Sequence, residues 1–203
     1  MPNTNPFPKW LLAFAITTVA VVLCVAYIDR PLADFLEQHF RHTPAWDTIR
    51  LALKPFSLAV AFALLFLLGC GALRIAGRPL PNWTKTPMLA SWAAMWGIAA
   101  EQIFKAIFGR IWADPGYVQE HKYGFDLFQG GSFPSGTATI STAIITVLWI
   151  LAPRTRIIGV VIVLLLCAAV VINNYHWLGD VIAGIFLGAS IGWMTVLLQR
   201  SEK

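Results

Sequence analysis

The sequence predicts an all-α fold, a polytopic membrane bundle of about six transmembrane helices that forms a single domain over residues 1–203. Composition is the first reason, because 58% of the residues are hydrophobic and only 12% are charged. With a mean hydropathy of +0.68, the chain is too apolar for an ordinary soluble domain. The second reason is that apolar runs of roughly 20 residues, long enough to cross a bilayer, recur along the chain. They lie at about 10–28, 56–73, 87–108, 134–152, 157–173 and 178–198.

The positions of the basic residues indicate how the chain is oriented. The net charge of +5 does not indicate a nucleic-acid partner, because the basic residues flank the spans. Short Lys/Arg-bearing loops stay in the cytoplasm, so we expect both termini there, although the two faces carry eight and seven of the fifteen basic residues. We therefore expect an integral protein of a bacterial inner membrane, with the opposite loops at the outer, periplasmic face. The cytoplasmic set includes Arg74, Arg78, Lys85, Arg154, Arg156, Arg200 and Lys203.

Two loops are expected on the outer face. Residues 29–55 mix apolar side chains such as Phe35 and Trp46 with charges, which is typical of an amphipathic segment in the membrane interface. A plain connector between two spans is the alternative. Residues 109–133 form the second loop, in which glycine and proline break any long helix. These residues are Gly109, Pro115, Gly124, Gly130 and Gly131.

Two patterns inside the apolar spans indicate packing. The last span carries Gly184, Gly188 and Gly192, a spacing that lets another helix approach closely, either within the fold or between copies in a homo-oligomer. All three cysteines also lie within apolar spans, so we interpret them as packing residues without a disulfide or metal role. They are Cys24, Cys70 and Cys167.

Three polar groups near membrane depth are the candidates for function, because burying polar groups is costly. The predicted topology brings all three to one membrane face. They are residues 101–110 at the end of the third span, residues 132–137 at the start of the fourth, and residues 173–180 between the fifth and sixth.

The first two groups suggest an anion site. Lys105 and Arg110 are cations near the end of an apolar helix, although Glu101, four residues before Lys105, makes an intrahelical ion pair the alternative. Ser135 and Gly136 open the next helix. Free amides and the positive end of a helix bind anions, and a simple N-cap is the alternative there.

The third group suggests a nucleophile. His176 and Asp180 are spaced i, i+4 and share one helical face. The carboxylate can accept a hydrogen bond from one imidazole nitrogen and leave the other free to attack, whereas a buried hydrogen-bonded pair is the alternative. Cations, a helix N-terminus and an oriented imidazole together indicate phosphoryl transfer.

These residues make the chain resemble the type-2 phosphatidic acid phosphatase superfamily of membrane lipid phosphatases, over about residues 100–190. That family has a lysine, six residues and Arg-Pro; then Pro-Ser-Gly-His; then Ser-Arg, five residues, His, three residues and Asp. The matching stretches here are 105–113, which starts Lys-Ala-Ile-Phe-Gly-Arg, 134–137, which reads Pro-Ser-Gly-Thr, and 174–180, which reads Asn-Tyr-His-Trp-Leu-Gly-Asp.

The resemblance implies roles for the matching residues. His176 would form a phosphohistidine, Asp180 would orient it, and Lys105, Ser135 and the Gly136 amide would hold the phosphate oxygens. Water would then release phosphate, and the family needs no metal or other cofactor. The implied partners are a lipid phosphate substrate and membrane lipids, with no nucleic acid.

Three departures from the family pattern bear on activity. Trp112 and Ala113 replace Arg-Pro, so Arg110 is the nearest cation and is expected to substitute. Ala169 and Val170 replace Ser-Arg, for which Asn173 or Asn174 is expected to compensate in part. Thr137 stands where the family has the histidine that protonates the leaving group, and such acid catalysis is commonly worth about 10²–10⁴-fold.

The missing acid favours some functions over others. A phosphate leaving from a diphosphate needs a proton less than an alkoxide does, so we expect hydrolysis or transfer on a lipid phosphate or diphosphate, with polyprenyl diphosphate as an example. The alternative is a catalytically impaired membrane protein that keeps the fold and binds phospholipid head groups. A small-solute transporter is a weaker interpretation, because the charged groups cluster at one face and the sequence shows no broken-helix pair at the membrane midplane.

Overall fold

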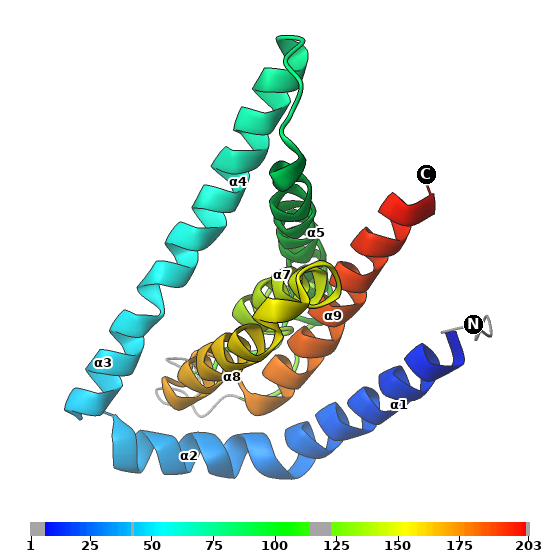
Figure 1. Ribbon diagram of the computed structural model, residues 1–203. Coiled ribbons are helices and arrows are strands. Elements are labelled where there is room, and N and C mark those ends of the chain that lie inside the picture. Colours follow the sequence, from blue (N-terminus) through cyan, green and yellow to red (C-terminus); the bar gives the residue numbers. More distant parts are fainter. Residues whose placement is uncertain (1–6, 42, 114–122, 202–203) are drawn as a thin grey trace.

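The structure, a computed structural model, describes residues 7–41, 43–113 and 123–201. Throughout this part of the chain the regular backbone is helical, and turns, irregular connections and one isolated bridge between Arg110 and Phe125 join the helices. Figure 1 shows the helices arranged around a central pair, α7 and α9. The helices are α1 (Phe7–Leu23), α2 (Asp29–Phe40), α3 (Pro44–Ala52), α4 (Lys54–Ile75), α5 (Lys85–Phe108), α7 (Gly136–Leu151), α8 (Arg156–Ile172) and α9 (Leu178–Ser201).

The six expected spans correspond to α1, α4, α5, α7, α8 and α9, which confirms the all-α prediction. Within the described residues, four helical stretches are long and apolar enough to cross a membrane, namely Phe7–Phe40, Pro44–Ile75, Pro153–Ile172 and Leu178–Gln199. The helix α7 is apolar but shorter. The helix α5 is long enough at 24 residues, but Glu101, Gln102 and its tryptophans lower its hydropathy.

The core lies where α7 packs between α5, α8 and α9. Small residues let these helices approach, and Ala93, Ala143 and Val147 are fully buried there. On α9, a Cβ added at Gly188 would lie 2.2 Å from the carbonyl oxygen of Thr139, so this position requires glycine.

The glycine face of α9 therefore has its partner inside the same chain. Added Cβ atoms at Gly184 and Gly192 would likewise lie 2.7 Å and 2.5 Å from carbonyl oxygens of α7. Of the two interpretations of this pattern, packing within the fold is confirmed. A homo-oligomer through these glycines stays a prediction, although α7 already lies against their face.

The N-terminal helices lie around this core. A π-helical turn at Cys24–Ile28 joins α1 to α2, and Figure 1 shows the long helix bending there so that α2 passes beneath the bundle. The helix α2 buries Asp29, Ala33 and Leu36, spaced four and three residues apart, and exposes Phe35. An amphipathic helix is thus confirmed for the start of residues 29–55.

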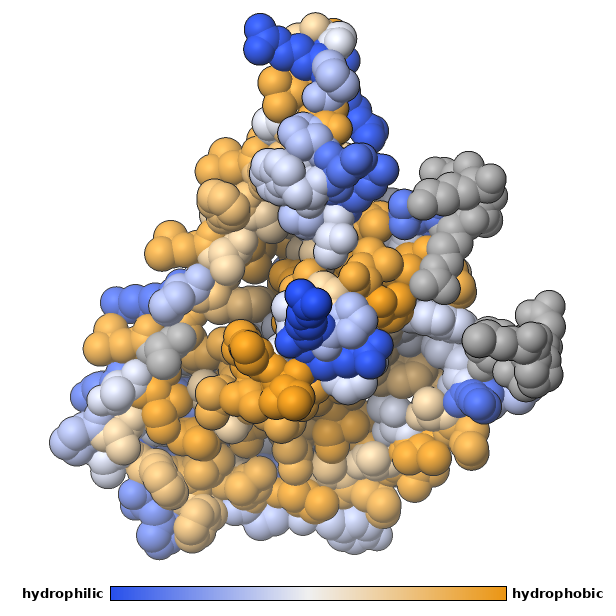
Figure 2. All heavy atoms as spheres, in the orientation of Figure 1, coloured by the Kyte–Doolittle hydropathy of each residue, from blue (hydrophilic) through white to orange (hydrophobic). Residues whose placement is uncertain are grey.

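The outer surface is apolar, as a membrane protein requires. Phe62 and Leu65 on α4 are 70% and 64% exposed. Figure 2 shows hydrophobic residues over most of the visible face, with hydrophilic ones at the turn between α4 and α5, in a small patch at the centre of the view and along its lower left edge. Exposed apolar side chains of this extent need a lipid or protein cover.

The connection between α5 and α7 is shaped by glycine at its start. Gly109 ends α5 with φ of +54°, and a Cβ there would lie 1.7 Å from the carbonyl oxygen of Asp126. Only glycine therefore allows the chain to turn tightly and deliver Arg110 to the bundle. Pro115, also expected to shape this loop, lies outside the described residues.

Candidate active site

Arg110 lies at the centre of a buried group of charged side chains. Its guanidinium donates to Asp180 Oδ1 and to Asp29 Oδ2, both at 2.6 Å, and the three side chains are at most 1% exposed. The rings of Phe125 and Trp177 lie 5.2 Å and 5.3 Å from the guanidinium carbon. Burial opposes the charge on Arg110, but the carboxylates outweigh it and raise its pKa. The guanidinium therefore stays charged.

This position differs from the one expected for Arg110. As a substitute phosphate ligand it would need a guanidinium edge open to the substrate, yet the side chain is fully buried and two carboxylates hold its terminal nitrogens. The structure places Arg110 between Asp29 and Asp180.

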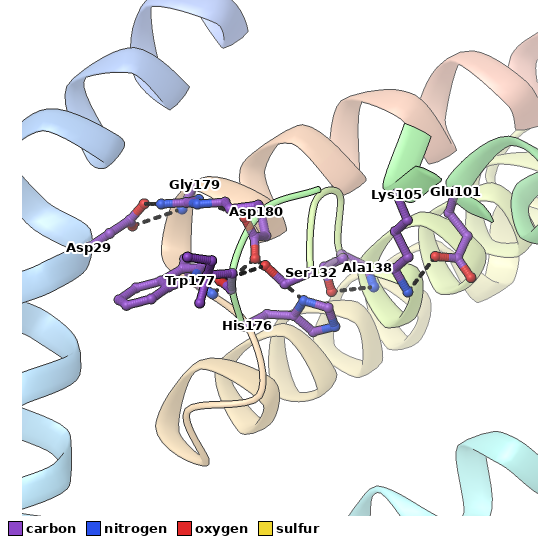
Figure 3. Close-up of polar contacts among 12 residues, drawn as sticks. Asp29, Glu101, Lys105, Ser132, Ala138, His176, Trp177, Gly179 and Asp180 are labelled. Carbon is purple, nitrogen blue, oxygen red and sulfur yellow. Dashed lines mark hydrogen bonds and ion pairs between the residues drawn. The ribbon is translucent and has the colours of Figure 1, made fainter. Parts of the chain in front are cut away.

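Asp180 presents its second oxygen to the histidine. Its Oδ2 accepts from the backbone amide of Trp177 at 3.2 Å and lies 3.5 Å from His176 Nδ1. Figure 3 shows both side chains beside the first turn of α9. At 3.5 Å the two groups are neighbours, but Nδ1 of His176 makes no hydrogen bond; catalytic hydrogen bonds are often long before substrate binds. The structure thus places His176 beside Asp180, as the i, i+4 spacing predicted.

Lys105 is paired within its own helix. Its Nζ lies 2.6 Å from Glu101 Oε2, and the two side chains are 15% and 6% exposed. The intrahelical ion pair, one of the two interpretations of this sequence, is therefore formed (Figure 3). The same Nζ lies 5.4 Å from the centre of the Trp112 ring, and that ring is 5.3 Å from the His176 ring. Trp112 thus lies near both Lys105 and the candidate nucleophile.

The start of α7 faces these groups. Ser135 is the N-cap, and its hydroxyl accepts from the amide of Ala138 at 3.4 Å. Its own amide donates to the carbonyl of Asp180 at 3.0 Å, which ties α7 to α9. A Cβ added at Gly136 would lie 3.1 Å from the Glu101 carboxylate, so an anionic group already lies beside this helix terminus. Thr137 follows in the first turn and is partly exposed.

The two asparagines expected to compensate for the missing arginine are engaged elsewhere. Asn174 donates to the carbonyl of Ala33 at 3.2 Å and to Glu37 at 3.3 Å, both on α2. Asn173 donates to the carbonyl of Ala169 at 2.9 Å. Their amide nitrogens therefore hold the turn before α9 against α2 and α8.

Sequence reasoning missed Asp29. It precedes Arg110 by 81 residues, and nothing in its surroundings resembles a motif. The available signal was a carboxylate at the end of an apolar span, where an unpaired charge is costly and a partner is expected. Within the described residues, no cluster of three or more His, Cys, Asp or Glu is arranged to hold a metal ion.

The fold and this cluster define an integral membrane protein with its polar groups gathered at one end of an apolar helical bundle. The sequence profile of the PAP2 superfamily matches residues 57–203. The chain therefore belongs to the PAP2 superfamily, as its motifs predicted. Membership makes it a membrane protein of the lipid phosphatase type.

A solved structure shares this fold. It is the crystal structure of a transmembrane PAP2-type phosphatidylglycerolphosphate phosphatase from Bacillus subtilis, with a TM-score of 0.63 and 18% sequence identity. The match covers 96% of this chain and 98% of that one. A comparison with curated proteins finds no match.

Proposed function

We propose that this protein is a lipid phosphatase or phosphotransferase that acts on a lipid phosphate or diphosphate through a phosphohistidine. In the first step His176 Nε2 forms a bond to phosphorus, and the bond from phosphorus to the leaving oxygen breaks. In the second step water, or another hydroxyl in a transferase, attacks phosphorus and gives its proton to solvent, while the bond from phosphorus to Nε2 breaks and His176 is released. No metal or other cofactor takes part in this scheme.

The observation that carries the proposal is the arrangement of Asp180 between Arg110 and His176. One carboxylate oxygen is held by the buried arginine, while the other faces Nδ1 of the histidine. An imidazole held in this way keeps its proton on Nδ1 and presents Nε2 as the nucleophile. Lys105 and the N-terminus of α7, with Ser135 and Gly136, would hold the phosphate oxygens on the opposite side.

The residues near the leaving group favour a diphosphate. Thr137 follows Ser135 and Gly136, and its hydroxyl titrates far too high to donate a proton near neutral pH. Phosphate departing from a lipid diphosphate carries its charge without full protonation, whereas an alkoxide does not. We therefore propose a polyprenyl diphosphate as the first substrate to test, ahead of the phosphate monoesters phosphatidate and phosphatidylglycerol phosphate.

The pairing of the cations supports a second candidate, a catalytically impaired protein that binds phospholipid head groups. Lys105 is neutralised by Glu101, and Arg110 is shared between two aspartates. A phosphate that enters this site must displace Glu101 before it gains a cation. Cations that are already paired favour weak binding of a phospholipid head group over rapid catalysis.

Phosphate release separates the two candidates. The purified protein in detergent is incubated with polyprenyl diphosphate, phosphatidylglycerol phosphate, phosphatidate and a lipid A phosphate, and free phosphate is measured. Release that depends on His176 supports an enzyme, with His176→Ala as the control for contaminating phosphatase. Silence with every lipid, combined with retention of these lipids on the protein, supports the binding protein.

We also propose that the site opens at the periplasmic face of a bacterial inner membrane. The proposal rests on the basic residues in the turns at 74–85 and 153–156, which lie between spans on the other side. Single cysteines at Thr155 and Asp126, in a background that lacks Cys24, Cys70 and Cys167, test it with an impermeant thiol reagent. Labelling at Asp126 in intact cells is expected, and labelling at Thr155 alone would reverse the orientation.

A further inference from the structure

Asp29 takes part in the active site although it lies in another part of the chain. We propose that Asp29 is a positioning residue that holds Arg110 so that one oxygen of Asp180 remains available to His176. The role given to His176 rests on the proposed function, but the placement of Asp29 does not. Residue 29 also lies outside the family match at 57–203, so the family profile does not include it.

The contacts of Asp29 link α2 to α9 by two routes. Its Oδ2 accepts from Arg110 at 2.6 Å, and its Oδ1 accepts from the backbone amide of Gly179 at 3.0 Å. Gly179 stands directly before Asp180 in the first turn of α9. Asp29 therefore fixes the partner of Asp180 and also the backbone that carries it.

The structure leaves room for this contact only because residue 179 is glycine. A Cβ at this position would lie 2.9 Å from Asp29 Oδ2 and 3.3 Å from a terminal nitrogen of Arg110. Glycine thus allows the ion pair to lie directly against the start of α9. Figure 3 shows Asp29 and Gly179 on the side of Asp180 away from Lys105.

The division of Arg110 between two carboxylates explains what Asp29 does. One terminal nitrogen donates to Asp29 and the other to Asp180 Oδ1. A guanidinium next to a single carboxylate usually takes both of its oxygens in a forked pair. Without Asp29, Arg110 would be free to fork onto Asp180 and occupy the Oδ2 that now faces His176.

The other charges around His176 do not replace this arrangement. Glu37 of α2 contacts Asn174 at 3.3 Å, and Lys105 of α5 is paired with Glu101 at 2.6 Å. Asp180 is thus the carboxylate that faces Nδ1, at 3.5 Å. Whether Asp180 can orient the His176 imidazole therefore depends on whether Arg110 binds one or both of its carboxylate oxygens.

The tautomer of His176 tests the proposal without any need for turnover. Histidine labelled with ¹⁵N in both ring positions reports which nitrogen carries the proton, and the His176 signals are assigned by their loss in His176→Ala. In the wild type we expect the proton on Nδ1. Asp180→Asn should mix the tautomers, and Asp29→Asn should shift the ring signals in the same direction. Asp47→Asn, the same change at an exposed site on α3, should leave them unchanged.

A second variant covers the case in which Asp29→Asn does not fold. Gly179→Ala keeps every charge and displaces Asp29 through the added methyl group, so it should shift the ring signals in the same way. Gly71→Ala on α4, where a Cβ meets nothing within 4 Å, is its control. Wild-type ring signals in folded Asp29→Asn or Gly179→Ala, alongside a shift in Asp180→Asn, would overturn the proposal.

Kinetics then separate this proposal from the proposed function. If the wild type turns over, Asp29→Asn should lower kcat about tenfold with little change in KM, a loss typical of groups that orient an active residue. In an Asp180→Asn background the same change should have no further effect. Absent turnover with shifted tautomers defeats only the proposed function, whereas turnover with unshifted tautomers defeats only the role of Asp29.

Discussion

The two halves of the site differ in how completely they are assembled. On one side, Asp29 and Asp180 each lie 2.6 Å from Arg110, and the second oxygen of Asp180 lies 3.5 Å from His176 Nδ1. On the other side, where phosphate oxygens would lie, Lys105 is already paired with the carboxylate of Glu101. Thr137 follows there in place of an acid.

Under the proposed mechanism, this difference predicts which step limits the reaction. Forming a bond to phosphorus requires an oriented imidazole, and that half has its supports in place. Binding the phosphate and protonating its leaving group require free cations and an acid, and these are the groups that are paired or missing. A substrate whose leaving group is already stable compensates best for such a site.

The largest effect is expected from the half that is complete. Asp180→Asn removes the charge that orients His176, and an equivalent change in a catalytic triad costs about 10⁴-fold in kcat. We expect a loss of similar order in phosphate release, while the protein still folds. The control is Asp47→Asn, with thermal unfolding measured for both. Activity within about threefold of wild type in folded Asp180→Asn would show that this half does not carry the chemistry.

A smaller gain is expected from repairing the other half. Thr137→His supplies an acid at the leaving group and should raise cleavage of a lipid phosphate monoester about tenfold, or roughly 1.4 kcal/mol of barrier. Cleavage of a lipid diphosphate should rise less, because its leaving phosphate needs less protonation. The measurement is kcat/KM for both substrates in both proteins.

Two results would contradict this view of Thr137. Equal stimulation of both substrates would remove the leaving-group argument. Silence from both would mean that Trp112 and Val170, in place of the family's arginines, leave no correctly held phosphate, and would favour the head-group binding protein.

The smallest effect is expected from replacing Glu101, the carboxylate that pairs with Lys105. Glu101→Gln leaves Lys105 free to pair with phosphate, so the Kd for inorganic phosphate, measured as product inhibition or by calorimetry, should fall about fivefold, or about 1 kcal/mol. Glu37→Gln, at a glutamate that also pairs with a cation four residues on (Arg41), serves as the control. Weaker phosphate binding in a folded Glu101→Gln protein would show that Glu101 helps to position Lys105 instead of competing for it.

The sequence predicted what depends on local pattern. Apolar runs located the spans, because a bilayer requires their length. The i, i+4 spacing placed His176 beside Asp180, and the same rule gave the Glu101–Lys105 pair as one of two interpretations. Each of these predictions needs only the geometry of one helix.

The sequence could not predict which partner a distant charge chooses. Arg110 was expected at the phosphate because it is the nearest cation to the missing arginine, but folding brings it between Asp29 and Asp180, 81 and 70 residues away. Similarly, Asn174 could not be assigned to α2 before the bend at Cys24–Ile28 was known. Burial of these side chains, which follows from tertiary packing, decided both cases.

The central claim is that His176 becomes phosphorylated, and trapping that intermediate tests it most directly. The protein is mixed with a lipid diphosphate labelled with ³²P at the terminal phosphate, denatured in alkali within milliseconds to seconds, digested and analysed by mass spectrometry. The account predicts an acid-labile, alkali-stable phosphate on the peptide that contains His176, and none in His176→Ala. Steady release of phosphate without label on that histidine, or label that persists in His176→Ala, would contradict it.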